Sequence, residues 1–191
     1  MQIASVPLED RFVRLEPFEE GVEAEVKAAL DCDPASCDIM VAPAYGAHFY
    51  AWWKAALAAM QAQTRIAYAV RRRSDGAVVG TTSLYEINPA YRRCEIGSTF
   101  YRPEARGGAI NPACKRLLLG HAFDAGAVRV EIITDTVNAQ SQAAILKLGA
   151  KAEGVLRKHE ITWTGRARDT AMFAVIDDDW PAVRDGACCN A

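Results

Sequence analysis

Alternation of hydrophobic and polar residues along the chain predicts most of its strands. Successive side chains of a strand point to opposite faces of a sheet, so a half-buried strand alternates with a period of two. One segment, residues 128–134, is instead almost continuously apolar and predicts a strand buried on both faces. Turn residues at 74–76 and 164–165 predict two hairpins. The predicted strands are residues 11–15, 66–72, 77–87, 93–101, 128–134, 151–163 and 168–176.

Apolar residues spaced three or four apart predict helices between these strands. The predicted helices are residues 20–30, 48–63, 111–123, 138–148 and 180–184. Asn111 and Asn138 are suitable N-caps for two of them, and Gly149 is a stop signal. Trp52 and Trp53 are adjacent in the second helix. Because adjacent helical residues cannot both face inward, we expect one of the two rings to line a groove or an interface.

The order of these elements predicts an α/β (α+β) fold. One strand and two helices precede three consecutive strands, and helix and strand then alternate before a final hairpin. This order builds a mixed, mostly antiparallel central sheet of about seven strands that is flanked by helices. A chain of 191 residues fits a single domain. We expect its core to extend over about 11–184 and to be followed by a loose tail, 185–191.

Composition and charge exclude several classes of protein. The chain is 51% hydrophobic and 24% charged, with a net charge of −2, so it lacks the basic field of a nucleic-acid-binding protein. No apolar run approaches the roughly 20 residues of a membrane helix. The first residues, MQIASVPLEDRF, do not read as a signal peptide, and the six cysteines form no CxxC pair. We therefore expect a cytoplasmic protein with no metal, no nucleic-acid partner and no membrane contact.

A turn-rich segment, residues 102–110, leads into the helix expected to start at Asn111. It contains Gly107 and Gly108, and Pro112 suits the first helical position because it needs no N–H partner there. A small-residue loop that enters a helix gathers backbone N–H groups and the positive end of the helix dipole, which favours phosphate. A turn that needs glycine only for its backbone explains the same residues. This segment by itself leaves both interpretations open.

Three segments together resemble the GNAT superfamily of acyl-CoA-dependent N-acetyltransferases, and most closely its ribosomal-protein N-terminal acetyltransferase branch. The first runs from Glu95-Ile96-Gly97 into Tyr101-Arg102-Pro103. The second is the loop RGGAIN, residues 106–111, in which Ala109 and Asn111 depart from the strict family pattern. The third is DTVNAQS, residues 135–141, followed by ILKLGA, residues 145–150. The resemblance extends from about Phe12 to Val183 and implies a GNAT-type sheet that is splayed near the CoA site.

The resemblance implies acetyl-CoA as co-substrate. Backbone N–H groups of the loop and the helix start would bind the CoA diphosphate, with Arg102 or Arg106 near an outer phosphate. The side chain of Asn138 would hold the pantetheine arm. The residues expected to contact CoA are Ser98, Thr99, Phe100, Tyr101, Arg102, Arg106, Gly107, Gly108, Ala109, Ile110, Asn111, Asn138 and Ser141.

Direct acetyl transfer to an amine needs a base, an oxyanion donor and a proton donor for the thiolate. Glu95 is the first candidate base, because it lies on the strand expected beside the thioester, and Glu86 is the weaker alternative. A strand splayed at Gly97 would leave N–H groups of residues 98–100 free to donate. The expected tyrosine is missing from the following helix, so Ser141 is the candidate proton donor. The structural alternatives are a solvent-facing glutamate, a glycine that avoids a clash and a helix-surface serine.

The acceptor pocket is expected between the first two helices and the final hairpin. Its predicted walls are Tyr45, Phe49, Trp52, Trp53, Glu95, His159, Trp163, Arg168 and Asp169. This set suits a peptide or protein N-terminus as well as a small-molecule amine. The oligomeric state stays open, and a homodimer is one option. The leading hypothesis is an acetyl-CoA-dependent N-acetyltransferase, and the alternative is a CoA-binding sensor or interaction domain with little or no catalysis. A dinucleotide-binding oxidoreductase is disfavoured because no GxGxxG follows the first strand.

Overall fold

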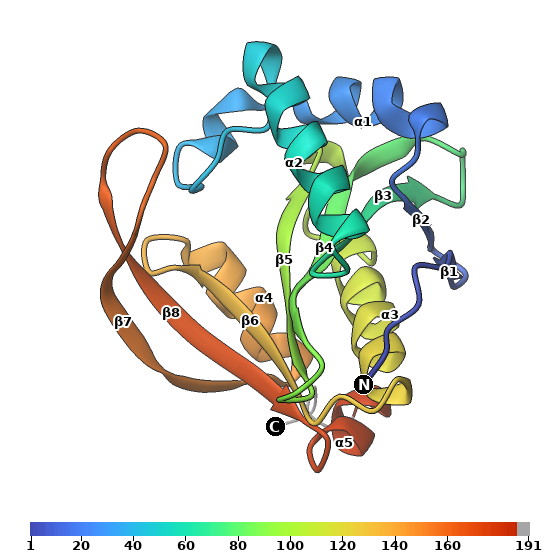
Figure 1. Cartoon of the computed structure of the whole chain (residues 1–191), viewed down its shortest axis with the longest axis vertical. Helices are drawn as coiled ribbons and strands as arrows, with labels where there is room; N and C mark the ends of the chain where they lie inside the picture. Colours follow the sequence, from blue (N-terminus) through green and yellow to red (C-terminus); the bar gives the residue numbers. More distant parts are fainter. Residues whose placement is uncertain (187–191) are drawn as a thin grey trace.

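An eight-stranded sheet with helices on both of its faces organises the computed structural model, which describes residues 1–186 (Figure 1). The strands are β1 (Leu8–Glu9), β2 (Val13–Pro17), β3 (Ile66–Arg72), β4 (Val78–Asn88), β5 (Arg93–Tyr101), β6 (Arg129–Asp135), β7 (Lys151–Ile161) and β8 (Ala167–Ile176). The helices are α1 (Glu23–Leu30), α2 (Phe49–Gln61), α3 (Ile110–Asp124), α4 (Ala139–Leu148) and α5 (Trp180–Arg184). The strand order is β1-β2-β3-β4-β5-β6-β8-β7.

The seven predicted strands are all present in the sheet, although several of their end residues differ, and one further strand was not predicted. β3 and β5 have the predicted bounds. The additional strand is β1, whose two residues pair with β2 and are too few to show a period of two in the sequence. Most of the tail predicted to be loose, residues 187–191, lies outside the described residues.

The predicted splay lies between β5 and β6. These two strands are parallel and pair only over three residues each, Arg93–Glu95 with Arg129–Glu131. β5 nevertheless continues to Tyr101 and β6 to Asp135. Figure 1 shows the two strands separating toward the side on which α1 and α2 lie. The sheet therefore opens immediately after Glu95.

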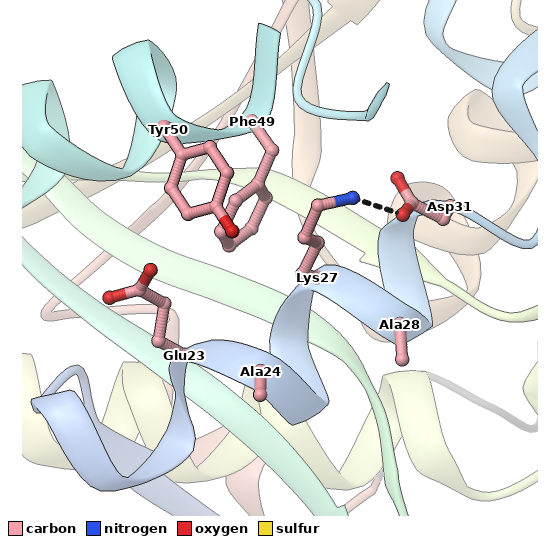
Figure 2. Close-up of a pocket in the computed structure, with 7 residues that line it drawn as sticks. All are labelled: Glu23, Ala24, Lys27, Ala28, Asp31, Phe49 and Tyr50. Atoms are coloured by element: carbon pink, nitrogen blue, oxygen red, sulfur yellow. Dashed lines mark hydrogen bonds and ion pairs between the residues drawn. The ribbon is translucent and has the colours of Figure 1, made fainter. Parts of the chain in front are cut away.

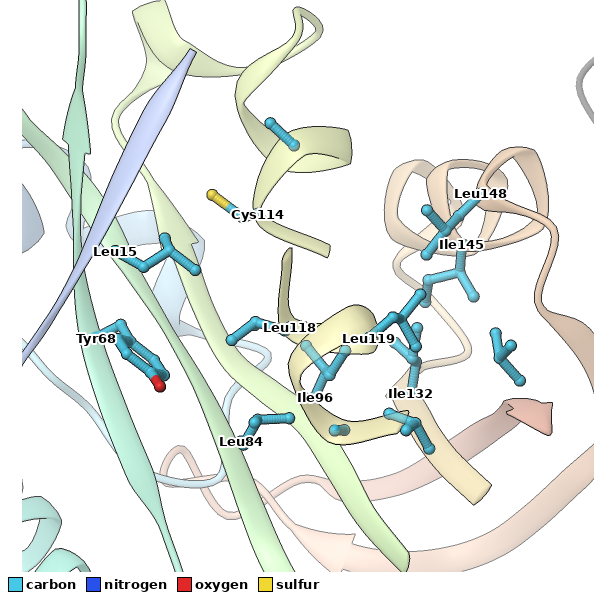
Figure 3. Packing of buried hydrophobic residues seen from close by; sticks show 14 of the residues in the cluster. Leu15, Tyr68, Leu84, Ile96, Cys114, Leu118, Leu119, Ile132, Ile145 and Leu148 are labelled. Carbon is cyan, nitrogen blue, oxygen red and sulfur yellow. The ribbon is translucent and has the colours of Figure 1, made fainter. Parts of the chain in front are cut away.

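Each face of the sheet has its own hydrophobic cluster. On one face, α3, α4 and α5 pack on the strands around the buried residues Leu84, Ile96, Leu118 and Ile132 (Figure 3). On the other face, the cluster contains residues of α1 and α2 together with alanines of β3 and Phe100 of β5. The two clusters fix the sheet between two helical layers, so each strand residue faces one defined layer.

The starts of α3 and α4 differ in how well the sequence predicts them. α3 begins at Ile110 with Ala109 as its N-cap residue, so the prediction that Asn111 caps this helix is wrong. Asn111 lies in the first turn, where its buried Oδ1 has no hydrogen-bond partner. The shift is possible because Pro112 needs no N–H partner anywhere in the first turn. The cap of α4 is confirmed, since Asn138 Oδ1 accepts a hydrogen bond from the Ser141 N–H at 3.0 Å.

The cysteines of the described part of the chain carry no bridging or metal-binding arrangement. Cys32 is exposed, whereas Cys37, Cys94 and Cys114 are buried, and all four are free thiols. Burial raises the pKa of the Cys94 and Cys114 thiols to about 12, so both are neutral core residues. Across residues 1–186, no three His, Cys, Asp or Glu side chains gather where they could hold a metal ion. In the same residues, each helix is too short or too polar to cross a membrane.

Candidate functional site

Glu95 is a buried carboxylate held by a tyrosine. Glu95 is only 6% exposed, which excludes the alternative of a solvent-facing strand glutamate. Glu86, the weaker candidate base, is exposed. Tyr85 is the paired residue on β4, and its Oη donates a hydrogen bond to Glu95 Oε1 at 2.5 Å. Burial raises the pKa of Glu95 to about 7, and the hydrogen bond from Tyr85 opposes part of that rise. A carboxylate that titrates near neutrality can take up and release a proton at working pH.

Gly97 makes room for the ring of Tyr85. A Cβ at position 97 would lie 2.4 Å from Tyr85 Cε1 and 2.9 Å from its Oη. The register places Gly97 opposite Ser83, two residues before Tyr85, so the tyrosine leans across the glycine to reach Glu95. The structural alternative, a glycine that avoids a clash, therefore holds at Gly97, and the group that it makes room for is a side chain of the protein itself. Tyr85 was missed, because its partner is visible only once the register of β4 and β5 is known.

β5 becomes irregular directly after Gly97. Its register with β4 shifts between Thr81 and Ser83, and Ser98 has a φ of 47°, a left-handed backbone conformation. No residue of β6 pairs with β5 in this segment. The N–H groups predicted as oxyanion donors, those of residues 98–100, therefore belong to the irregular, splayed part of the strand. Their role toward a thioester stays a prediction.

A buried lysine contacts the same irregular segment of β5 from the face of the sheet that α3 covers. Lys115 of α3 is 7% exposed, and its Nζ lies 3.4 Å from Thr99 Oγ1. The Thr99 hydroxyl is also 2.9 Å from that of Thr82. Burial lowers the pKa of Lys115 to about 8. The pattern of α3 does not predict this contact, because lysine is normally a surface residue.

We expect Lys115→Met to raise the free energy of unfolding at pH 7. The pKa of about 8 in the folded protein lies below the ordinary value of 10.5, so folding disfavours the ammonium form. This penalty is fully present below pH 8 and disappears as the pH rises toward 10.5. Removing this penalty should raise the free energy of unfolding at pH 7 by about 1–3 kcal/mol. Urea unfolding at pH 7 and pH 9.5 measures the effect, with Lys54→Met on the exposed side of α2 as control. Equal or lower stability of the Lys115 variant at pH 7 would contradict the prediction.

The loop predicted to bind phosphate connects β5 to α3. Residues Gly107, Gly108 and Ala109 are exposed, Gly107 has a φ of 73°, and a Cβ at either glycine would meet no atom within 4 Å. Two arginines of the loop, Arg102 and Arg106, already have partners within the protein. Arg102 pairs with Glu104 at 2.7 Å, and Arg106 donates to the Tyr101 carbonyl at 2.7 Å and pairs with Asp33 at 2.7 Å. The open backbone of the loop fits access of a phosphate to its N–H groups.

A cationic cavity of about 440 Å³ borders the start of α3. Its lining residues are Arg11, Phe12, Arg72, Arg73, Ser74, Ala109 and Ile110. None of these lining residues is an Asp or a Glu. Two of the arginines have partners beside the cavity: Arg72 pairs with Asp75 at 2.5 Å and Arg73 with Glu9 at 3.1 Å. Guanidinium groups therefore lie beside the first turn of α3, where the helix dipole also favours an anion.

Comparison with known proteins identifies the family of this chain. Residues 13–151, which include Glu95, the loop and α4, match the family model described as Acetyltransferase (GNAT) domain. The chain belongs to this GNAT family. A GCN5-related N-acetyltransferase from Brucella melitensis superposes with a TM-score of 0.87 at 29% identity, covering 97% of this chain and 85% of that one.

Two further relatives are more distant from this GNAT chain. The uncharacterized N-acetyltransferase YoaA of Bacillus subtilis is 27% identical over 117 residues, which span 61% of this chain and 65% of YoaA. The match thus covers just under two thirds of that relative's length. Mycobacterium smegmatis RimJ, solved in complex with CoA-disulfide, has a TM-score of 0.79 at 19% identity over 95% of this chain and 91% of its own. At that identity the likeness shows a shared fold.

The two tryptophans of α2 in this GNAT chain have different positions. Trp53 is 3% exposed and stacks on Phe18 with 4.2 Å between ring centroids, so it is a core residue and not a wall of an open pocket. Trp52 is half-buried, and Arg65 lies over its ring, 5.6 Å from the centroid. The two adjacent rings thus differ in burial as expected, and the expectation that Trp52 lines a groove or an interface stays a prediction. α2 turns Trp53 to the sheet, which forces its neighbour to the side.

The tip of the final hairpin contacts the segment before α2. Trp163 donates from Nε1 to the Cys37 carbonyl at 2.9 Å. Its ring is 6.3 Å from that of Tyr45 and 5.7 Å from that of His48, centroid to centroid. Figure 1 shows the β7–β8 hairpin extending beside the opened part of the sheet. The predicted position of the acceptor site, between the first helices and this hairpin, remains a prediction.

Polar residues of the hairpin are held by contacts within it. Arg168 is buried and pairs with Glu160 at 3.1 Å. His159 Nδ1 lies 3.3 Å from Thr170 Oγ1, and Asp169 accepts a hydrogen bond from the Lys158 N–H at 2.7 Å. These predicted wall residues have structural partners, and their contact with an acceptor is untested.

A separate cavity of about 410 Å³ lies between α1 and α2 (Figure 2). Its lining residues are Glu23, Ala24, Lys27, Ala28, Asp31, Phe49 and Tyr50. Lys27 contacts Asp31, which also accepts a hydrogen bond from the Gly46 N–H at 2.7 Å. Phe49, one of these lining residues, is fully buried. Neither Glu95 nor Tyr85 lines it, so it is distinct from the candidate active site.

Proposed function

We propose that this protein transfers the acetyl group of acetyl-CoA directly to a primary amine, either a peptide or protein N-terminus or a small-molecule amine. Glu95 carries the proposal. It is a buried carboxylate with a pKa near 7, placed where β5 and β6 begin to separate. Burying a carboxylate costs free energy of folding. An acetyltransferase can use such a group as the base that deprotonates the amine, whereas a CoA sensor needs no base. This disfavours the non-catalytic alternative.

The residues present fit the binding of acetyl-CoA, which supplies the acetyl group as a thioester. The exposed backbone of the loop before α3 would bind the diphosphate, beside the guanidinium groups of the cationic cavity. The opening between β5 and β6 leaves an edge of β5 uncovered from residue 96 onward. The polar groups of a pantetheine arm could hydrogen bond to such an uncovered edge as an added strand would.

Glu95 would remove the proton that an ammonium group must lose before it attacks. Tyr85 occupies Oε1 of the carboxylate, which leaves Oε2 for the substrate. A free lysine-like amine has a pKa of about 10.4, so at neutral pH a base is needed for most of the acceptor molecules. Ser141, at the first turn of α4, remains the proposed proton donor for the departing thiolate.

The finer placement in the ribosomal-protein N-terminal acetyltransferase branch is also a proposal. It is supported by the three segments that resemble this branch and by the absence of a tyrosine from α4. It would make a peptide N-terminus one of the acceptors.

Thiol release tests the proposed activity. The full chain is incubated with acetyl-CoA and a panel of peptide and small-molecule amines, and free CoA is followed with a thiol reagent. We expect release that depends on both the amine and the protein. If no amine gives release above the buffer rate while calorimetry still shows CoA binding, the sensor alternative replaces the enzyme.

We expect Asn138→Ala to weaken acetyl-CoA binding and to lower stability, whereas Asn138→Ser separates the two effects. Asn138 Oδ1 caps α4, and loss of such a cap costs about 1 kcal/mol. Serine keeps the cap and removes the amide that the pantetheine arm would contact. We expect both variants to bind acetyl-CoA about 3- to 10-fold more weakly, the value of one hydrogen bond. Calorimetry and thermal unfolding measure the two effects, and wild-type affinity in Asn138→Ser would contradict the pantetheine assignment.

A further inference from the structure

Arg65 places a guanidinium group between the sheet and α2. Its Nε and Nη2 donate to Ser83 Oγ at 3.1 and 2.9 Å, and Nη2 also donates to Ser98 Oγ at 2.9 Å. The guanidinium carbon lies 5.6 Å from the ring centroid of Trp52. Burial lowers the pKa of Arg65 to about 10, so the group still carries its charge at neutral pH.

No carboxylate of the described residues forms an ion pair with this guanidinium. Its hydrogen-bond acceptors are serine hydroxyls, which satisfy donors but do not neutralise charge. Arg168, a buried arginine of the β7–β8 hairpin, has in contrast Glu160 as its counter-ion at 3.1 Å. Arg65 is half-buried, and a partly desolvated charge without a counter-ion costs free energy that an anion from outside would offset. The hydrogen bonds of Arg65 to the two serines use Nε and Nη2, which leaves Nη1 to donate to another group.

The position of Arg65 relative to Glu95 follows from the register. Ser83 is paired with Gly97, and the next pair on the same face is Tyr85 with Glu95. Side chains two residues apart on a strand share a face and lie about 7 Å from one another. Ser83, which holds the guanidinium, is therefore one such step along β4 from Tyr85, which holds the carboxylate, on the face that α1 and α2 cover. Tyr85, the residue that holds Glu95, is also close enough to Arg65 to raise the pKa of its guanidinium against the effect of burial.

We propose that Arg65 binds an oxyanion of the acceptor, a carboxylate or a phosphate, and that the acceptor is therefore an amine with an anionic group a few bonds from its nitrogen. The proposal rests on the proposed function, in which Glu95 receives the proton of that amine. Guanidinium presents paired N–H groups that match the oxygens of carboxylate and phosphate. The face of Trp52 would cover the apolar part between the two charged ends.

A purely structural role makes a different prediction. Arg65 connects Ser83 of β4 to Ser98 at the irregular part of β5, so it could simply hold the strand in that shape. A structural clamp would affect anionic and neutral acceptors equally. A charge receptor would affect the ratio between them.

The test compares matched acceptors that differ in one charge. The pairs are γ-aminobutyrate with butylamine, phosphoethanolamine with ethanolamine, and glycylaspartate amide with glycylasparagine amide, which separate carboxylate from phosphate and small amines from peptides. We expect the wild-type protein to favour the anionic member of at least one pair by about 10- to 100-fold in kcat/KM, as one charged hydrogen bond would give. Arg65→Met should bring that ratio close to one, and Arg65→Lys should restore part of it. Arg184→Met, at an exposed ion pair with Asp185, is the matched control and should keep the wild-type ratio.

Two results would overturn the proposal. One is a wild-type protein that uses neutral members as well as anionic ones. The other is an Arg65→Met variant that loses activity equally for both members of each pair. If no amine is acetylated at all, the proposed function fails, and the intrinsic fluorescence of Trp52 then decides this inference separately. A saturable change on titration with γ-aminobutyrate or phosphoethanolamine that disappears in both Arg65→Met and Trp52→Phe supports an anion site, and the absence of such a change overturns it.

Discussion

Glu95→Gln is expected to lower kcat/KM by about 10²–10⁴-fold above pH 7, while the affinity for acetyl-CoA stays at its wild-type value. Glutamine has nearly the same shape as glutamate and can still accept the hydrogen bond from Tyr85, but it cannot take a proton from an amine. With a pKa of about 7, wild-type activity should rise with pH up to about that value, because only the ionised carboxylate acts as a base. This limb of the pH profile should be absent from the variant. Steady-state kinetics over a range of about pH 5.5 to 9, which brackets this pKa, measure the pH profile. Calorimetry measures the affinity for acetyl-CoA.

The same substitution should increase stability. The pKa of Glu95 in the folded protein lies above its ordinary value of 4.5, so the folded state favours the neutral acid. The resulting stabilisation is fully present below pH 4.5 and is lost as the pH rises through 7. Glu95→Gln should thus raise the free energy of unfolding by about 2–3 kcal/mol at pH 8 and by little at pH 5. An inactive but stabilised variant identifies a catalytic carboxylate, whereas a destabilised variant or an unchanged pH profile would remove Glu95 from this role.

Tyr85→Phe provides the companion measurement. The hydrogen bond from Tyr85 lowers the pKa of Glu95, so its loss should move the rising limb of the profile to higher pH. A structural role of the tyrosine would change stability without moving that limb.

Gly97→Ala is expected to cost about 1–3 kcal/mol of stability and to lower activity more strongly than this loss explains. The new Cβ would lie 2.4 Å from Tyr85 Cε1, so the ring must move away from Glu95. Displacing it breaks the 2.5 Å hydrogen bond and leaves the buried carboxylate without its donor. Urea unfolding and kcat/KM measured on the same preparations test the two parts. Gly21→Ala is the control, because a Cβ at that position meets no atom within 4 Å.

A double-mutant cycle with Tyr85→Leu shows whether the ring is the cause. In the Tyr85→Leu background the ring that the Cβ would meet is absent, so Gly97→Ala should have almost no further effect on stability. The coupling energy should then account for most of the single-variant loss. Additive effects of the two substitutions would mean that the glycine is needed for the backbone of β5 and not for Tyr85.

The sequence by itself determined the elements and the family. Strong local signals fix these features: the strands at residues 66–72 and 93–101, and the cap and stop at Asn138 and Gly149, all appear in the structure where they were predicted. Such signals depend on neighbours along the chain, so they can be recognised without a fold. The resemblance to GNAT proteins also follows from short segments in a fixed order, and the match over residues 13–151 shows the family.

Tertiary structure alone decided which side chains meet and how they are charged. The register of β4 and β5 pairs Tyr85 with Glu95, and a shift of one strand by one residue would place the two side chains on opposite faces of the sheet. Packing of two helical layers buries Glu95 and Lys115, which moves the pKa of the first up and of the second down. It also leaves Arg65 beside two serines instead of a carboxylate. These properties depend on contacts between distant parts of the chain and on exclusion of water, neither of which can be read from a local pattern.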